Sequence, residues 1–272
     1  MSERTVREAR RAAVVGAGAW GTTFACLLAE AGTPTTLWAR RDHVAAEINA
    51  GSNERYVPGR RLPEGVSATS DLGRAVEGAD LIVVAVPSQS AREVLSPLQG
   101  GLGPDVLAVS LMKGVELGTG LRMSQVLTEA LDLPAERVAV ISGPNLADEI
   151  AARQPTATVV AATDEAVAAR VAALCATSTF RPYTNTDVLG VELCGAIKNV
   201  IALAVGAAVG CGFGDNSKAT IITRGLVRSL AWGWPWERVR RHSRDWRAWA
   251  TWLRPAPAPC RATRPSAVIW VR

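Results

Sequence analysis

The chain has 272 residues, of which 48% are apolar, and a formal net charge of +5. That length allows one large or two ordinary domains, and the apolar content is sufficient for their cores, which predicts a globular protein. The charge is uneven, because residues 229–272 hold nine arginines against two acidic residues, a balance of +7 that leaves −2 on residues 1–228. The first 228 residues therefore do not predict a nucleic acid or an anionic membrane as a partner.

The first predicted element is a strand that ends in a glycine turn and opens a helix, in the stretch Val-Val-Gly-Ala-Gly-Ala-Trp-Gly at 14–21. Gly16 suits the tight turn, Gly18 lets the backbone approach a pyrophosphate, and Gly21 lets the helix lie close to its strand. The free N–H groups at the helix start then face the anion. An ordinary glycine turn is the alternative. A dinucleotide site is favoured because an apolar run precedes the stretch and a helical apolar pattern follows it as far as Gly32.

The second predicted strand, 35–38, is followed by Arg40 and Arg41, where an NAD site usually has an acidic residue that holds the ribose 2′-hydroxyl. A pair of guanidinium groups fits a 2′-phosphate, so the sequence favours NADPH, with NADH still open. Two solvated arginines at the start of a loop are the alternative. Tyr56 lies in the loop that follows a helix predicted at 42–49, and it could flank the cofactor or pack within the loop.

Strands and helices alternate along the rest of the first 185 residues. Continuous apolar runs predict strands buried on both faces, as in a parallel sheet, at 81–86, 106–110, 138–141 and 157–162. Helical segments are predicted at 71–77, 88–95, 123–131 and 164–175. The pattern indicates an α/β fold with a Rossmann-type doubly wound parallel sheet over about residues 10–185, whose ligand lies beyond the carboxyl ends of the strands.

Two of these strand ends carry unusual residues. Lys113 follows the strand at 106–110, and Gly143, Pro144 and Asn145 follow the strand at 138–141. A lysine at the mouth of the sheet can meet a phosphate or an oxygen near the nicotinamide, and a surface lysine is the alternative. The loop at 143–145 is either held against the site or caps a helix at 146–150.

From Val188 the composition changes, since residues 188–210 contain only Glu192 and Lys198 as charges. This segment predicts the core helix of a second domain. A membrane span is disfavoured, because a lysine in mid-span costs about 3 kcal/mol and the segment is rich in glycine and alanine. An unpaired ammonium on such a helix is costly, so the pKa of Lys198 is expected to fall, which suits proton exchange near neutral pH. Pairing with Glu192, or a head group that reaches water, is the alternative.

The chain has five cysteines, with neither a C-x-x-C pair nor a metal-like spacing, and two histidines. Free thiols are therefore expected, and neither a metal site nor a histidine-based catalytic triad is predicted. The arginine-rich start leads into the glycine motif and not to a cleavage-like end, so a cytoplasmic location is expected.

Several motifs agree on one family. They are Gly-Ala-Gly-Ala-Trp-Gly at 16–21, Val-Pro-Ser at 86–88, Lys-Gly at 113–114, Ile-Ser-Gly-Pro-Asn at 141–145, Gly-Ala-Ile-Lys-Asn-Val-Ile-Ala at 195–202, Gly-Asp-Asn-Ser-Lys-Ala at 214–219 and Thr-Arg-Gly at 223–225. Over about residues 10–228 the chain resembles the bacterial NAD(P)-dependent glycerol-3-phosphate dehydrogenases. The Lys-Asn and Ser-Gly-Pro-Asn segments set aside most other Rossmann enzymes.

The resemblance implies a cytoplasmic enzyme that reversibly reduces dihydroxyacetone phosphate to sn-glycerol 3-phosphate with NADPH or NADH, for glycerophospholipid synthesis. It implies that Lys198 is the catalytic proton donor and acceptor, with Asn199 in support. The substrate residues that it implies are Lys113, Gly143, Asn145 and Lys198. Together with the glycine motif and its neighbouring loop, the expected cofactor-binding residues are Gly16, Gly18, Ala19, Trp20, Gly21, Arg40, Arg41, Tyr56, Lys113 and Ala147.

The expected partner is thus a small molecule, with neither a nucleic acid nor a membrane involved, and a homodimer is compatible with the sequence. One alternative is a dinucleotide-binding protein without catalysis, and another is a lysine-dependent Rossmann reductase of the ketopantoate type. A third alternative is that the arginine- and tryptophan-rich end binds nucleic acid or a membrane surface.

The family pattern stops after Arg228. The family's Gly-Leu-Gly-Asp-Leu and Ser-Arg-Asn segments, which hold the substrate and its phosphate, do not follow, and residues 229–272 hold seven of the nine tryptophans. A shifted reading frame of residues 230–263, with free choice of synonymous codons, contains both segments in order. We therefore predict a dinucleotide-binding Rossmann domain at 1–187, the start of a helical substrate domain at 188–228, and an out-of-frame end at 229–272. The helical domain would then be incomplete, and the chain is expected to bind NADPH weakly and to turn over little.

Overall fold

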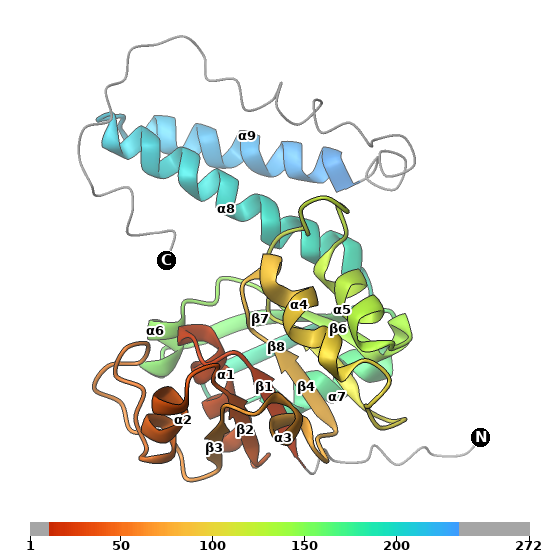
Figure 1. Cartoon of the computed structure of the whole chain (residues 1–272). Helices are drawn as coiled ribbons and strands as arrows, with labels where there is room; N and C mark the ends of the chain where they lie inside the picture. Colours follow the sequence, from red (N-terminus) through yellow and green to blue (C-terminus); the bar gives the residue numbers. More distant parts are fainter. Residues whose placement is uncertain (1–10, 234–272) are drawn as a thin grey trace. The chain divides into compact units, whose positions relative to one another are not determined.

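The computed structural model describes residues 11–233 (Figure 1). These residues fall into two compact units, which are divided between Glu192 and Leu193. Unit 1 contains a sheet with its helices, and unit 2 is helical. Most of the arginine- and tryptophan-rich end, from residue 234 onward, lies outside the described residues. The hypothesis of a frame shift at about residue 229 therefore stays a prediction.

The sheet of unit 1 has, within the described part of the chain, eight strands in the order β3-β2-β1-β4-β5-β6-β7-β8. They are β1 (Ala12–Val15), β2 (Thr35–Trp38), β3 (Val66–Thr69), β4 (Leu81–Val84), β5 (Leu107–Ser110), β6 (Val138–Ser142), β7 (Thr156–Ala162) and β8 (Phe180–Asn185). The order reverses between β1 and β4, which is where a doubly wound sheet binds its ligand. The predicted fold class is confirmed with one difference. Strand β7 runs antiparallel to β6, so the sheet is not wholly parallel.

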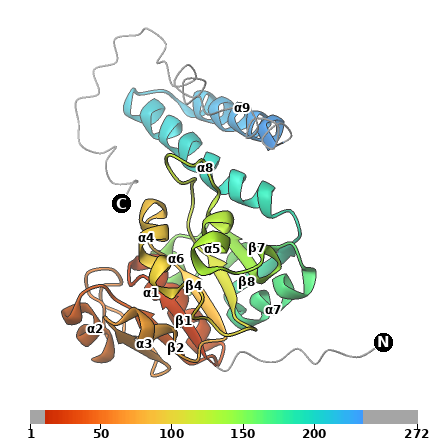
Figure 2. The ribbon, with the colours of Figure 1, turned by 45° about the vertical axis from the view of Figure 1, so that its right-hand side comes forward.

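Helices cover both faces of this sheet (Figures 1 and 2). They are α1 (Ala19–Glu30), α2 (Asp42–Asn49), α3 (Leu72–Val76), α4 (Ala91–Leu95), α5 (Met123–Leu131), α6 (Ala147–Ala151) and α7 (Glu165–Cys175), with short 3-10 turns η1 (Ser88–Ser90), η2 (Ser96–Leu98) and η3 (Ala135–Arg137). Helices α2 and α5 have the bounds that the sequence predicts. The helical segment expected at 88–95 is divided into η1 and α4.

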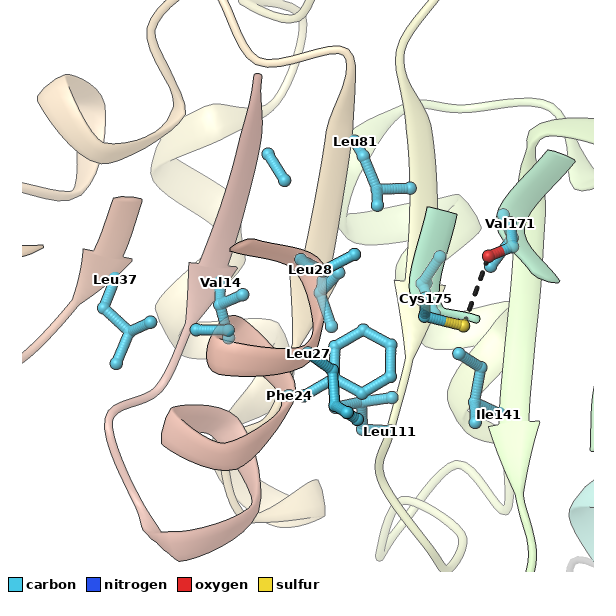
Figure 3. Packing of buried hydrophobic residues seen from close by; sticks show 14 of the residues in the cluster. Val14, Phe24, Leu27, Leu28, Leu37, Leu81, Leu111, Ile141, Val171 and Cys175 are labelled. Carbon is cyan, nitrogen blue, oxygen red and sulfur yellow. Dashed lines mark hydrogen bonds between the residues drawn. The ribbon is translucent and has the colours of Figure 1, made fainter. Parts of the chain in front are cut away.

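The core consists of two hydrophobic clusters, one on each face of the sheet. Successive side chains of a strand point to opposite faces. Ala12 and Val14 of β1 accordingly belong to the cluster that also contains residues of α1, α6 and α7, whereas Ala13 and Val15 belong to the cluster with α4 and α5. Figure 3 shows part of the first cluster, where Phe24 of α1 is fully buried near Leu28 and Leu111. This burial on both faces explains the continuous apolar runs of the central strands.

Two strands escaped prediction, and both lie at the edges of the sheet. Of the four residues of β3 only Val66 is buried, and of the six residues of β8 only Phe180 is buried. An edge strand contacts the core through few of its side chains, so it does not need an apolar run. Its place in the sheet is decided by the hydrogen bonds to its one neighbouring strand.

The cysteines of the described residues differ in whether the thiol is free or disulfide-bonded. The expected free thiol is confirmed for Cys26, Cys175 and Cys194, and it is wrong for Cys211, which is disulfide-bonded. Cys175 is fully buried, and its Sγ donates a hydrogen bond to the carbonyl oxygen of Val171 at 3.3 Å (Figure 3). Burial raises the pKa of the Cys26 and Cys175 thiols to about 12. Neither thiol is therefore ionised near neutral pH.

Unit 2 is formed by the later part of α8 (Val188–Gly210) and by α9 (Asp215–Gly233). The two helices lie side by side (Figures 1 and 2), and a Cβ added at Gly225 of α9 would come within 2.7 Å of Ile201 Cδ1 on α8. The predicted 23-residue helix is confirmed in its bounds. By length and composition it is the one helix within residues 11–233 that could cross a membrane, which is weak evidence because the core helix of a soluble protein passes the same test.

The sequence predicts that this segment is the core helix of a second domain, with an apolar face left exposed if the helices that should cover it are lost, and in the described structure that face is exposed. Val200 and Leu203 of α8 are exposed by 58% and 59%, and Leu226 and Val227 of α9 by 55% and 62%. Only two helices of this unit are described, so each can cover just one side of the other. The apolar side chains on the remaining sides have no described neighbour that removes them from solvent.

Candidate active site

The glycine motif lies at the carboxyl end of β1, at the point where the strand order reverses. Gly16 has a φ of +118°, and a Cβ there would lie 2.7 Å from the carbonyl oxygen of Ala85, just after β4. A Cβ at Gly21 would collide with the carbonyl oxygen of Gly16. At Gly18, by contrast, nothing lies within 4 Å of the position of an added Cβ. The protein thus leaves open space beside the Gly18 backbone, which fits the approach of a pyrophosphate.

Helix α1 begins at this open space. Gly18 is its N-cap residue and supplies no side-chain hydrogen bond, so the first N–H groups, from Ala19 onward, have no acceptor within the helix. These N–H groups and the helix dipole favour an anion. The residues present therefore fit a dinucleotide, with the phosphates at the start of α1.

The side chain of Asn53 forms hydrogen bonds with the glycine turn and with the helix that follows it, a role that the sequence does not reveal. Its side chain is fully buried, and Nδ2 donates to the carbonyl oxygen of Ala17 at 3.2 Å and to Thr22 Oγ1 at 2.9 Å. The backbone N–H of Tyr56 donates to the carbonyl oxygen of Asn53 at 3.1 Å. An asparagine in a loop gives no periodic signal. Only its position beside a turn 36 residues away in the chain shows what it does.

The expected cofactor residues beyond the glycines lie around the same edge of the sheet. Arg40 and Arg41 follow β2, the neighbour of β1, and both are exposed. Trp20 is half-buried, with its ring edge-on to that of Phe24 at 5.5 Å between centroids. Tyr56 is also half-buried, and the Arg55 guanidinium lies 5.4 Å from its ring centroid.

Lys113 and Gly143 come together at the carboxyl edge of the sheet. Lys113 follows β5 and Gly143 follows β6, and these neighbouring strands are parallel, so their ends lie at the same edge. The half-buried Lys113 donates from Nζ to the carbonyl oxygen of Gly143 at 3.1 Å. The ammonium is therefore held at this edge, whereas the surface-lysine alternative would leave it in solvent.

Asn145 is fixed beside this pair by Thr158 of β7. Its Nδ2 donates to Thr158 Oγ1 at 2.9 Å, and Thr158 Oγ1 donates to the carbonyl oxygen of Ser142 at 3.2 Å. The alternative that this loop caps the next helix is wrong, because Leu146 is the N-cap of α6 and makes no side-chain cap hydrogen bond. Thr158 was not anticipated, although a hydroxyl within an otherwise apolar strand was a signal. Ala147, an expected cofactor residue, is the first residue of α6.

The Oδ1 atom of Asn145 is buried and has no hydrogen-bond partner within the described residues. A buried acceptor without a partner costs about 1–3 kcal/mol. Since the Nδ2 side of the amide is occupied by Thr158, Oδ1 is free to accept a hydrogen bond from a ligand hydroxyl. The cluster of Lys113, Gly143 and Asn145 thus offers an ammonium and an amide acceptor at one place.

The sequence predicts dry surroundings for Lys198 in a complete helical domain, and the loss of those surroundings if the domain is incomplete. Both Lys198 and Asn199 are exposed on α8 in the described structure. Glu192, the carboxylate suggested as the partner of Lys198, forms hydrogen bonds with other residues. Glu192 is 7% exposed and accepts from Arg122 Nη1 at 2.6 Å and from the backbone N and Oγ of Ser124, both at 2.7 Å. Residues six apart on a helix do not share a face, which is why Glu192 cannot serve Lys198 as a neighbour.

A hollow of about 750 Å³ lies elsewhere, between the loops at 71–80 and 97–106. These loops precede β4 and β5, so the hollow is at the amino edge of the sheet, opposite the glycine motif. Ligands of doubly wound sheets bind at the carboxyl edge. The hollow is therefore not a candidate for the cofactor or the substrate.

Two family models match the chain. The NAD-dependent glycerol-3-phosphate dehydrogenase N-terminus matches residues 11–168, and the corresponding C-terminus matches residues 187–231. The chain belongs to the NAD-dependent glycerol-3-phosphate dehydrogenase family. It is therefore an NAD(P)-dependent oxidoreductase by family, and its cofactor is NAD(P)H.

The relatives agree with this family. The chain is 55% identical over 224 residues to the glycerol-3-phosphate dehydrogenase (NAD(P)+) of Streptomyces griseus, which covers 82% of this chain and 67% of the relative. The corresponding protein of Thermobifida fusca is 55% identical over 222 residues, or 81% of this chain and 66% of the relative. A 2.1 Å crystal structure of glycerol-3-phosphate dehydrogenase from Coxiella burnetii has 35% identity and a TM-score of 0.75 over 81% of this chain and 67% of that one.

The matched part of the chain thus spans about two thirds of the length of these glycerol-3-phosphate dehydrogenases. The resemblance inferred from the motifs at 16–21, 141–145 and 195–202 is confirmed. The alternative of a ketopantoate-type reductase is not favoured, because both the N-terminal and the C-terminal family models match this chain.

Proposed function

We propose that this chain reduces dihydroxyacetone phosphate to sn-glycerol 3-phosphate, reversibly, with NADPH preferred over NADH. The observation that carries the proposal is the cluster at the carboxyl edge of the sheet. There the Lys113 ammonium lies 3.1 Å from the Gly143 carbonyl oxygen, beside an Asn145 Oδ1 without a partner in the described structure. A cation and a buried acceptor suit a substrate that carries both a phosphate and a hydroxyl group.

When bound, the reduced nicotinamide supplies the hydride that reaches the C2 carbonyl. Lys198, as an ammonium, gives a proton to the oxygen that becomes the alkoxide. Lys113 places positive charge beside the same oxygen or the phosphate, where it stabilises the developing negative charge. Gly143 and Asn145 orient the substrate. In the oxidative direction a neutral Lys198 takes the hydroxyl proton, so the two directions have different pH optima.

The cofactor is held by the residues around β1 and β2. Gly16, Gly18, Ala19, Trp20 and Gly21 surround the pyrophosphate at the start of α1. Arg40 and Arg41, exposed at the end of β2, meet a 2′-phosphate, which supports NADPH. Tyr56 and Ala147 complete the lining. The cytoplasm is the proposed location, in glycerophospholipid synthesis, as the family resemblance implies.

The proposed domains are a Rossmann domain at 1–187, the start of a helical substrate domain at 188–228, and an out-of-frame end at 229–272. The exposed Lys198 supports an incomplete helical domain, because proton transfer benefits from surroundings that exclude water. Turnover is then much lower than in the family, and NADPH is still bound, but weakly. Sequencing the gene across codon 229 tests this. An intact frame there refutes the shift, whereas a confirmed shift predicts that the restored frame recovers activity.

The catalytic assignment is tested by NADPH oxidation with dihydroxyacetone phosphate as substrate. Lys198→Ala is expected to lower turnover at least ~100-fold while NADPH binding stays nearly unchanged. Lys218→Ala is the matched control, since Lys218 is also on a helix of unit 2 but is paired with Asp215. Normal turnover by Lys198→Ala would refute the role of Lys198. NADPH binding without any turnover, in the frame-restored protein as well, would instead identify a non-catalytic dinucleotide-binding protein.

A further inference from the structure

The loop that carries Lys113, residues 111–122, is folded back on itself between β5 and α5. Three glycines in it have positive φ angles, Gly114 at 130°, Gly118 at 85° and Gly120 at 68°. The backbone N–H of Glu116 donates to the carbonyl oxygen of Leu121 at 2.8 Å. Lys113 thus lies at the start of a compact loop, three residues beyond Ser110, the last residue of β5.

Gln89 binds this loop from the neighbouring strand end. It lies in the turn η1 after β4, and its Nε2 donates to the carbonyl oxygen of Val115 at 2.8 Å. Its Oε1 accepts from the backbone N–H of Leu117 at 2.9 Å. One side chain therefore satisfies a donor and an acceptor of the loop backbone, two and four residues after Lys113. This bidentate contact fixes the local direction of the loop.

A second contact comes from Arg92 in α4. Its Nε donates to Glu116 Oε1 and its Nη2 to Glu116 Oε2, both at 2.9 Å. Thr119 Oγ1 also donates to Glu116 Oε2, at 2.7 Å. Glu116 is only 9% exposed, and the Arg92 hydrogen bonds lower the pKa of its carboxyl group. The parallel two-bond geometry is the strong form of an arginine–carboxylate contact.

The backbone at Gly114, the residue after Lys113, is also closely packed. At Gly114 an added Cβ would lie 3.4 Å from Ser88 Oγ, in the turn that also carries Gln89. The connection after β4 therefore supports the connection after β5 along residues 114–117. Lys113 itself is used by the Nζ contact to Gly143 on the other side. The contacts that hold the backbone after Lys113 are thus separate from the contact that its ammonium group makes.

We propose that Gln89, aided by the Arg92–Glu116 pair, is a positioning residue that holds the Lys113 ammonium where it meets the cofactor and the substrate. The inference rests on the proposed function of Lys113. Holding a charged group in place before the ligand arrives removes the entropy cost of ordering it during binding. The effect of Gln89 passes through its hydrogen bonds to the backbone of Val115 and Leu117.

The test is a double-mutant cycle read out by NADPH binding to the full chain. Gln89→Met keeps the length of the side chain and removes both hydrogen bonds. It is expected to weaken NADPH binding at least about threefold in the wild-type background. In the Lys113→Met background the same change is expected to have an effect of less than about twofold, because the group that it positions is gone. Gln154→Met, at an exposed glutamine after α6, is the matched control.

The outcomes separate the two proposals. If Lys113→Met leaves NADPH binding unchanged, the proposed role of Lys113 fails and this inference fails with it. If Lys113→Met weakens binding but Gln89→Met does not, Lys113 keeps its role and positioning by Gln89 is refuted. Equal effects of Gln89→Met in both backgrounds would show a general structural contribution and would also refute it. Glu116→Gln, which keeps the shape of the side chain, is expected to show the same dependence on Lys113 as Gln89→Met.

Discussion

Gly16 and Gly18 belong to one motif, but the structure gives them different reasons to be glycine. At Gly16 the reason is internal, since its φ of +118° and the carbonyl oxygen of Ala85 both exclude a side chain. At Gly18 the backbone is extended, with φ −75° and ψ −179°, and the protein leaves the position of a Cβ empty. A pyrophosphate that approaches the backbone here would explain the second glycine.

Substitution by alanine separates these reasons. Gly18→Ala is expected to change the free energy of unfolding by less than about 0.5 kcal/mol and to weaken NADPH binding at least about tenfold, because the methyl group occupies the space of the pyrophosphate. Gly16→Ala is expected to destabilise the fold by at least about 1–2 kcal/mol. Urea unfolding and NADPH fluorescence titration measure the two quantities. Wild-type affinity in Gly18→Ala would place the pyrophosphate elsewhere.

Glu192 is a second residue whose importance comes from its partners. Its carboxylate accepts from Arg122 and twice from Ser124 in a nearly buried position. Glu192→Ala leaves the Arg122 cation without its partner, so we expect a loss of about 3–5 kcal/mol in the free energy of unfolding. Chemical unfolding followed by tryptophan fluorescence measures it. Glu136→Ala, at an exposed glutamate, is the control, and a loss no larger than in the control would contradict the prediction.

At the scale of elements, loop 111–122 shows how a segment between a strand and a helix becomes part of a site. Its glycines allow the sharp changes of direction, and its side chains and backbone bind the turn after β4. Both ends of this contact follow central strands that the apolar runs predicted well. The contact itself joins residues 24 apart in the case of Arg92 and Glu116, which no local pattern indicates.

The Arg92–Glu116 contact predicts a pH dependence of stability. The pKa of Glu116 is lowered in the folded chain, chiefly by the hydrogen bonds from Arg92. Its contribution to stability is therefore fully present above the ordinary glutamate pKa and is lost as the pH falls through the lowered value. The difference in unfolding free energy between wild type and Glu116→Gln is expected to be constant from pH 7 down to about pH 5 and to shrink as the pH falls below about 4.

Urea unfolding at several pH values measures this difference. Glu93→Gln, at an exposed residue of the same helix α4, is the control and should stay within about 0.5 kcal/mol of wild type throughout. A difference between wild type and Glu116→Gln that grows on acidification would have the wrong sign and would overturn the explanation.

For the whole molecule, the apolar surface of unit 2 is the main feature that the family membership does not explain. Large side chains on α8, on α9 and between them are exposed, including Leu203 by 59%, Phe213 by 57% and Leu226 by 55%. Soluble monomers rarely keep an extended apolar patch in water. The chain is therefore expected to self-associate, and more strongly as its concentration rises.

Sedimentation velocity over a concentration series checks this. Leu203→Glu combined with Leu226→Glu is expected to shift the distribution toward monomer. Leu117→Glu, at a leucine that is 63% exposed in unit 1, is expected to leave it unchanged. A wild-type chain that stays monomeric over the series would show that this surface is covered in solution.

The sequence by itself determined the order of the central elements, the dinucleotide motif at 16–21 and the family, because these depend on local spacing and on short motifs. It did not show the edge strands β3 and β8 or the antiparallel β7, since few of the edge side chains are buried and strand direction is set by the neighbouring strand. Only the tertiary structure showed how far Lys198 is exposed and which distant groups Asn53, Thr158 and Gln89 bind. The physical reason is that burial and hydrogen-bond partners are properties of where distant segments meet.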